Sequence, residues 1–146
     1  MTSRPVAIDP FLAAFVSAYA RGRPAPELAR TAYLDALLRR CVEETGPSLL
    51  CSDCRTLLEL ERVFDPAGAC ARVMRLECLV IVLVHFIHQP WLRSDPLVQI
   101  AQWSFVDHLL AAVEATPLPA TKDISDALKS LHSHLDRALR RGRNGR

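Results

Sequence analysis

The chain has 146 residues, half of which are hydrophobic, and its formal net charge at neutral pH is +2. A single domain of this length can bury roughly two-thirds of the surface that its unfolded form exposes, so the composition requires neither disorder nor a disulfide scaffold. Residues 1–139 carry 14 basic and 16 acidic side chains. A body so close to neutral argues against a broad nucleic-acid-binding surface.

Apolar residues recur at helical spacing and predict six helices. The predicted ranges are about residues 10–21, 26–45, 48–64, 66–89, 96–113 and 124–141. Asp-Pro pairs at residues 9–10, 65–66 and 95–96 precede three of these helices. Aspartate is a preferred N-cap, and proline suits the first helical position because its missing N–H would have no partner there anyway. We therefore expect these three helices to begin at the Asp-Pro pairs.

The segment LECLVIVLVHFI, residues 76–87, is apolar on every side of the element that it forms. Because it has no polar stripe, it cannot lie on a surface, and the other helices are expected to surround it. Its β-branched residues would also suit a buried strand, but no second strand of matching character is available to satisfy its backbone. The uncharged stretch 78–92 is too short for a membrane span. The sequence thus predicts an all-α fold, a compact bundle of about six helices around a central hydrophobic helix.

The remaining helices each have one apolar side, which we expect to face the central helix. In the third helix this side carries Leu50, Cys54, Leu57, Leu58 and Phe64. Residues 1–141 are predicted to form a single helical domain, which ends at Gly142, and residues 142–146 a flexible basic tail.

The tail region carries a cluster of four arginines: Arg140, Arg141, Arg143 and Arg146. These side chains can complement the negative end of the last helix dipole. A nuclear-import or nucleic-acid patch, or contact with an acidic membrane surface, are the other interpretations. The first interpretation is favoured, because four arginines without neighbouring aromatic residues are a weak signal for binding.

Cys51 and Cys54, together with His85 and His88, supply the two thiolates and two imidazoles of a tetrahedral zinc site. The 30 residues between the two pairs depart from zinc-finger spacing. We therefore expect the two cysteines to line the buried side of the third helix and His85 to lie in the core. A redox role for the Cys-x-x-Cys sequence would need a βαβ context, which is absent. No cofactor is expected, with zinc on these four residues as the alternative.

Three compact catalytic motifs do not occur in the chain. There is no Gly-x-Ser-x-Gly, no phosphate-binding glycine loop and no His-Glu-x-x-His. His132 and His134 do not share a helix face, because they lie two residues apart, and we expect both to be solvated. No nucleophile, base and orienting residue can be named as a set, so the protein is not expected to be an enzyme.

The apolar surplus of the predicted helices indicates a contact with another protein or with a second copy of the chain. The expected contacts are Trp91 and Leu92, in the loop after the central helix, and the apolar seam of the last helix at Leu128, Leu131 and Leu135. Trp91 can also serve as a lid on the core, which is the commoner role. We thus expect a non-enzymatic interaction or regulatory module that binds a partner through an apolar groove or helix face. The alternative is a zinc-stabilised, nucleic-acid-associated regulator that uses the Cys/His set and the basic tail.

The five cysteines are odd in number, and several of them sit within apolar patterns. The N-terminal sequence has no apolar core of signal-peptide length. We therefore expect an intracellular, reducing compartment, either the cytoplasm or the nucleus. The predicted layout, a hydrophobic central helix ringed by amphipathic ones, resembles that of Bcl-2-type regulators. The likeness is one of architecture, because the Asn-Trp-Gly-Arg motif of those proteins does not occur in the chain, and their groove residues are not carried over.

Overall fold

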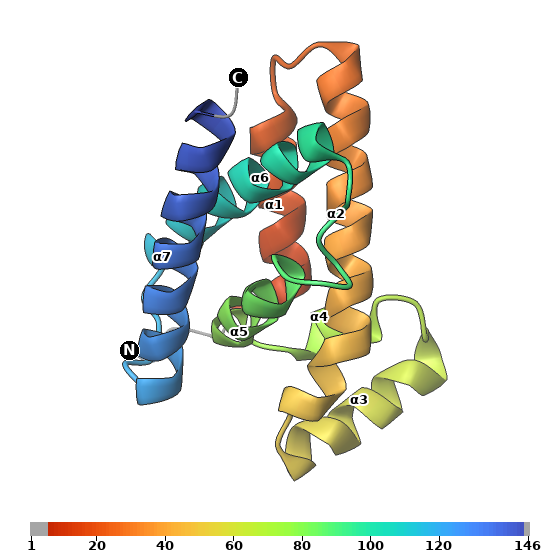
Figure 1. Ribbon diagram of the computed structural model, residues 1–146. Helices are drawn as coiled ribbons and strands as arrows, with labels where there is room; N and C mark the ends of the chain where they lie inside the picture. The colour runs from red at the N-terminus through yellow and green to blue at the C-terminus, as the bar shows by residue number, and fades with distance from the viewer. Residues whose placement is uncertain (1–5, 145–146) are drawn as a thin grey trace.

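The computed structural model describes residues 6–144, which form α-helices and one short 3-10 helix but no β-strand (Figure 1). The elements follow in the order α1 (Ile8–Ala20), α2 (Ala25–Thr45), η1 (Gly46–Leu49), α3 (Ser52–Phe64), α4 (Ala69–Val73), α5 (Leu76–Phe86), α6 (Pro96–Glu114) and α7 (Lys122–Asn144). The predicted all-α bundle is confirmed.

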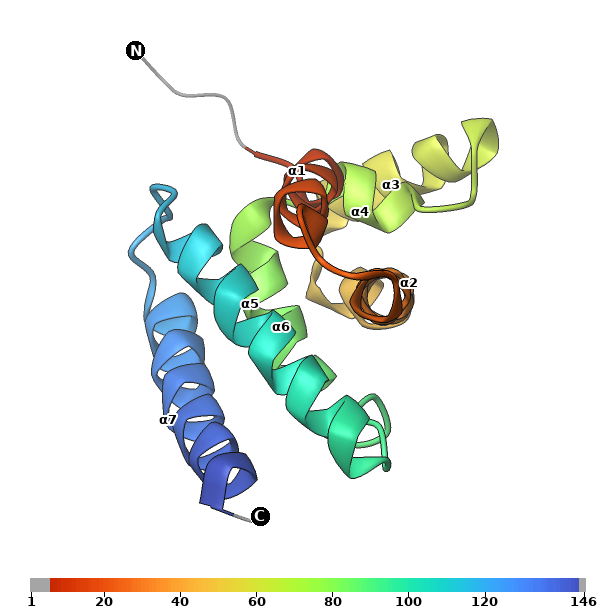
Figure 2. The same ribbon diagram turned by 90° about the horizontal axis from the view of Figure 1, so that it is seen from above.

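Helix α5 is the centre of the bundle, as the continuous apolar run predicted. Its buried residues, each at most 1 % exposed, are Leu76, Leu79, Val80, Val82, Leu83 and Phe86. Helices α1, α2, α6 and α7 all pack against it. The view from above shows α5 between α7 on one side and α1 and α2 on the other (Figure 2). Enclosure by these four helices explains why most of the segment is apolar, and only one side, with Glu77 and Ile81 half-buried and His85 exposed, reaches solvent.

The apolar seam of α7 packs within the molecule. Its buried members are Ile124, Leu131, Leu135 and Ala138, and Leu128 is half-buried. The seam covers α5 and α6, on which α7 makes its main contacts. The side of the last helix that the heptad spacing marks as apolar is thus buried within the chain.

Only one of the three Asp-Pro pairs caps a helix as predicted. The Asp95 carboxylate accepts hydrogen bonds from two first-turn amides of α6, at 2.9 and 3.3 Å. Asp9 lies inside α1, and its carboxylate accepts a 2.7 Å bond from Arg39 instead. Asp65 ends α3, while α4 begins only after Gly68, which has a left-handed conformation with φ +73°. The prediction that these two pairs start helices is wrong, because other contacts use both carboxylates.

The predicted fourth helix, over residues 66–89, is divided into α4 and α5. Met74 and Arg75 have extended backbones between the two helices. The amide of Ile8 donates to the Met74 carbonyl at 3.0 Å, and the amide of Leu76 donates to the Val6 carbonyl at 2.8 Å. These bonds form a single antiparallel bridge. The N-terminal segment thus supplies partners for backbone groups that a continuous helix would have paired internally.

Helix α7 continues through Gly142 to Asn144, so the predicted helix end at Gly142 is wrong. A Cβ atom at Gly142 would lie 3.2 Å from the Cγ1 atom of Ile100, which shows how closely the end of α7 approaches α6. The first three residues of the predicted flexible tail, 142–144, are therefore helical. Residues 145 and 146 lie outside the described part of the chain.

Candidate functional site

Helix α3 turns most of its apolar side chains to solvent. Leu57 and Leu60 are each 55 % exposed, Val63 is 81 % exposed and Phe64 is 86 % exposed. We call these four side chains the α3 face. They make up half of the large hydrophobic residues that are strongly exposed in the described part of the chain. Helix α3 and the loop that follows it stand away from α6 and α7 at one end of the bundle (Figures 1 and 2).

The α3 face is continuous along one side of the helix. Leu57, Leu60 and Phe64 are spaced by three and four residues, which places them on the same side, and Val63 adjoins them. The opposite side faces the bundle, where Leu58 is 2 % exposed and Cys54 is half-buried. The prediction that Leu57 and Phe64 face the core together with Leu58 is therefore wrong.

Polar contacts at both ends fix the orientation of α3. The Arg72 guanidinium, on α4, donates to the Glu61 carboxylate of α3 at 2.7 Å and to two carbonyls of the intervening loop at 2.7 and 2.6 Å. Near the other end, the Arg55 side chain donates to the Pro47 carbonyl at 3.3 Å. Because Leu58 is buried between these two sets of hydrogen bonds, α3 cannot rotate its exposed apolar side inward without breaking them.

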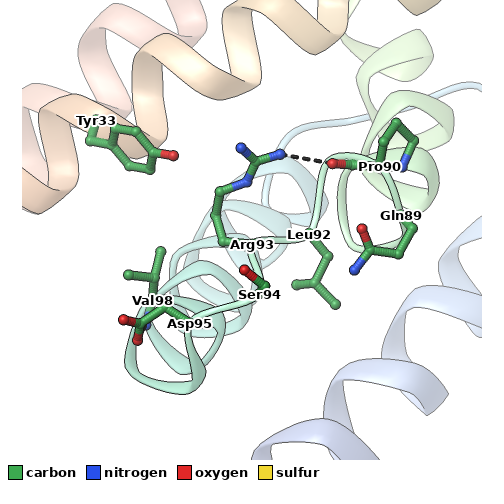
Figure 3. Close-up of a pocket in the computed structure, with 8 residues that line it drawn as sticks. All are labelled: Tyr33, Gln89, Pro90, Leu92, Arg93, Ser94, Asp95 and Val98. Carbon is green, nitrogen blue, oxygen red and sulfur yellow. Dashed lines mark hydrogen bonds between the residues drawn. The ribbon is translucent and has the colours of Figure 1, made fainter.

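A hollow of about 390 Å³ opens between α2 and the loop before α6 (Figure 3). Tyr33 of α2 lies on one side of it, and Leu92 and Arg93 lie on the other (Figure 3). The Arg93 guanidinium donates to the carbonyl of Pro90 at 2.7 Å and to that of Trp91 at 3.0 Å. Because the cation is engaged with the backbone of its own loop, it orders that loop rather than offering a free charge to a ligand.

The predicted contact residues lie in two places. Trp91 is half-buried against the core, in the lid position considered from the sequence, and Leu92 borders the hollow. In α7, Leu131 and Leu135 are at most 1 % exposed, and only Leu128 is partly accessible. The α7 seam is thus used inside the chain. We therefore move the expected contact surface from this seam to the α3 face.

The four residues of the zinc alternative are not brought together. Cys51 and Cys54 lie at the start of α3, whereas His85 and His88 lie at the far end of α5. In residues 6–144 no group of three or more His, Cys, Asp or Glu side chains is placed to hold a metal ion. The expected burial of Cys51 is wrong, because its side chain is exposed, and His85 is also exposed rather than in the core.

The two α7 histidines differ in their surroundings. His132 is exposed, as predicted, and its ring pairs with the Glu114 carboxylate of α6. His134 is half-buried instead of solvated, and its ring centroid lies 4.6 Å from that of His88. Burial lowers the pKa of His134, and the neighbouring His88 ring lowers it further. The pair places two ionisable rings at the contact between α5 and α7.

The C-terminal arginines are described only in part. Arg140 is exposed and pairs with Asp136 at 3.2 Å, one turn earlier in α7, and Arg141 is also exposed. The side chain of Arg143 and all of Arg146 lie outside the described residues. An exposed pair of this kind contributes at most ~0.5 kcal/mol, so Arg140 is not needed for the fold.

Comparison with protein-family models, with curated proteins and with solved structures finds no match to this chain. The resemblance of the predicted layout to Bcl-2-type regulators therefore gains no support from these comparisons. Across residues 6–144, no helix combines the length and the apolar character that crossing a membrane requires.

Proposed function

We propose that the protein is a non-enzymatic interaction module that binds a partner protein by laying the α3 face in an apolar groove of that partner. The observation that carries this proposal is the exposure of four large apolar side chains on a single helix of 13 residues. Single exposed hydrophobic residues are ordinary on folded domains, whereas a contiguous apolar surface marks an interaction site.

The spacing within the α3 face favours a hydrophobic groove of the partner as the surface that receives this helix. Leu57, Leu60 and Phe64 stand at positions i, i+3 and i+7, which are anchor positions of an amphipathic helix seated in a hydrophobic groove. The hydrogen bonds of Arg72 and Arg55 keep α3 in its helical form before a partner binds. Binding therefore does not have to order the helix, which removes a cost that a disordered ligand segment would bear.

The area of the α3 face argues against a second copy of the chain as the occupant. Burying a Leu, Val or Phe side chain fully contributes ~1.5–3 kcal/mol, at ~25 cal/mol per Å² of apolar surface. With exposures between 55 % and 86 %, the four side chains offer roughly 200–300 Å² by the same scale. A stable interface of either kind needs about 800 Å² from each partner, polar and apolar surface together. Two helices packed side by side bury little beyond their facing side chains, whereas a groove also covers the flanks of α3 and so comes closer to this area.

The proposal is tested by photo-cross-linking in the cells that produce the protein. Benzoylphenylalanine replaces Leu60 at the centre of the α3 face, or Leu97 as the control, because Leu97 is a 71 % exposed leucine on a different helix. We expect a discrete adduct with one other protein from position 60, and none from position 97. Adding Phe64→Asp to the position 60 variant should abolish this adduct.

Circular dichroism of each variant excludes unfolding as the cause of a lost adduct. Three results would overturn the proposal. These are equal adducts from positions 60 and 97, no adduct from position 60, and an adduct from position 60 that contains two copies of this chain alone. The last result would make the α3 face a self-association surface. A foreign adduct from position 60 that survives Phe64→Asp would also contradict the predicted contact.

A further inference from the structure

Cys51 and Cys54 form a pair of thiols at the first turn of α3. Cys51 stands directly before the helix as its N-cap residue and is exposed, whereas Cys54 is half-buried. The backbone N–H of Cys54 and then its thiol lower the pKa of Cys51, because both stabilise the thiolate. The same thiol–thiolate interaction, followed by burial, raises the pKa of Cys54. The pair thus joins an accessible thiol that ionises readily to a sheltered thiol that keeps its proton.

The other three cysteines lack this combination. Burial raises the pKa of Cys41 to about 11 and that of Cys70 to about 12, and both side chains are fully buried. Burial also raises the pKa of the half-buried Cys78. Reactivity of a thiol requires both access and a populated thiolate. Among the five cysteines, Cys51 is therefore the one placed to act as a nucleophile, with Cys54 within reach as its resolving partner.

The thioredoxin-type role considered from the sequence requires a βαβ unit, which the described residues lack, but thiol–disulfide exchange itself requires only an accessible thiolate and a neighbouring thiol. We propose that Cys51 and Cys54 are a redox-active dithiol that undergoes thiol–disulfide exchange with low-molecular-weight disulfides. The Cys51 thiolate attacks one sulfur of the small disulfide, which forms a mixed disulfide and expels the other sulfur as a thiolate. Cys54 then gives up its proton and attacks the Cys51 sulfur. This step breaks the mixed disulfide and releases the second small thiol. Two electrons pass from the cysteine pair to the small disulfide, which leaves as two thiols.

The local structure suits both steps. Cys51 is the N-cap residue of α3 and Cys54 is the third residue of its first turn, the spacing at which an N-cap side chain reaches the helix backbone. A disulfide needs Cβ atoms ~3.5–4.5 Å apart, and Cys51 lies outside the helix, so it can adjust without unwinding α3. The positive charge of Arg75 lowers the pKa of Cys54. Arg75 thereby favours the thiolate that the second step requires.

The test follows the full-length, reduced protein by mass spectrometry after addition of oxidised glutathione at neutral pH. We expect wild type to end as an internal Cys51–Cys54 disulfide without a bound glutathionyl group. Cys54→Ser should accumulate one glutathionyl group on Cys51, because nothing resolves the mixed disulfide. Cys51→Ser should remain reduced, and Cys78→Ser, the control, should behave as wild type. Iodoacetamide should alkylate Cys51 at least about tenfold faster than Cys78.

Several results would overturn the proposal. These include a stable glutathione adduct on wild type, a disulfide that forms equally well in Cys51→Ser, and alkylation of Cys51 no faster than that of Cys78. Circular dichroism of the serine variants checks that each remains folded. The proposal does not depend on the function proposed for the α3 face, so Leu60→Asp should leave the exchange rate unchanged.

Discussion

Gln102 should be one of the most sensitive positions in the chain. Its side chain is 0 % exposed. Its amide nitrogen donates to the Phe86 carbonyl at 3.0 Å and to the Trp91 carbonyl at 3.2 Å, and its oxygen accepts from the Arg93 amide at 3.2 Å. Phe86 ends α5, and the amide that would pair with its carbonyl in a longer helix belongs to residue 90, a proline without an N–H. Gln102 therefore replaces a missing backbone donor from the neighbouring helix.

Gln102→Leu keeps most of the volume but removes all three bonds. The Trp91 carbonyl retains a bond from the Arg93 side chain, so the Phe86 carbonyl and the Arg93 amide bear the loss. Each buried polar group without a partner costs ~1–3 kcal/mol. We therefore expect the free energy of unfolding to fall by about 2–4 kcal/mol, less than two fully buried groups would lose, because the Arg93–Gln102 bond is only part-buried. Urea denaturation followed by far-UV circular dichroism measures this change.

The control for this measurement is Gln99→Leu. Gln99 lies one turn earlier in the same helix and is only half-buried, so its replacement should change the stability by at most ~0.5 kcal/mol. If Gln102→Leu unfolds at the same urea concentration as Gln99→Leu, then the three hydrogen bonds do not stabilise the fold as their geometry implies.

Two further predictions concern packing and pH. Gly46→Ala should destabilise the fold by about 1–3 kcal/mol, because the added Cβ atom would lie 2.5 Å from the sulfur atoms of Cys70 and Met74; a thermal midpoint equal to that of wild type would contradict it. Burial lowers the pKa of His134, and the charges of His88 and two arginines of α7 lower it further. As the pH falls through ~6.5, this histidine is therefore protonated more fully in the unfolded state than in the folded state. Wild type should therefore lose stability as the pH falls below neutrality, and a comparison of urea midpoints over this range should show a smaller loss in His134→Gln. Equal pH dependence in the two proteins would exclude this contribution.

The centre of the fold was predictable because α5 has no continuous polar stripe, and such a segment is accommodated only between other helices. The α7 seam was predictable for a related reason, since its heptad spacing defines one narrow apolar side. The Asp-Pro pairs were less informative. The carboxylate of Asp9 faces Arg39, thirty residues away in the sequence, and no local pattern shows that such a partner will compete with capping.

The orientation of α3 could not be predicted from its own residues. Leu58 points inward, and Leu57, Leu60, Val63 and Phe64 point outward, so apolar side chains occupy most of the circumference of the helix. The choice between the two sides depends on contacts with α4 and the loop before α3, which bring Arg72 and Pro47 to the helix. An excess of apolar residues over a single stripe is the signal in the sequence, but this excess does not show which side of the helix faces the core.

Titration with the purified partner from the cross-linking experiment measures directly whether the α3 face binds it. Fluorescence anisotropy would compare wild type, Leu60→Asp and Leu97→Asp. We expect Leu60→Asp to weaken binding at least about tenfold, because it removes a leucine that the groove would bury and places a charge there. Leu97→Asp should bind within about twofold of wild type, as expected of a surface substitution outside the contact. Equal affinities for all three proteins would contradict binding through the α3 face.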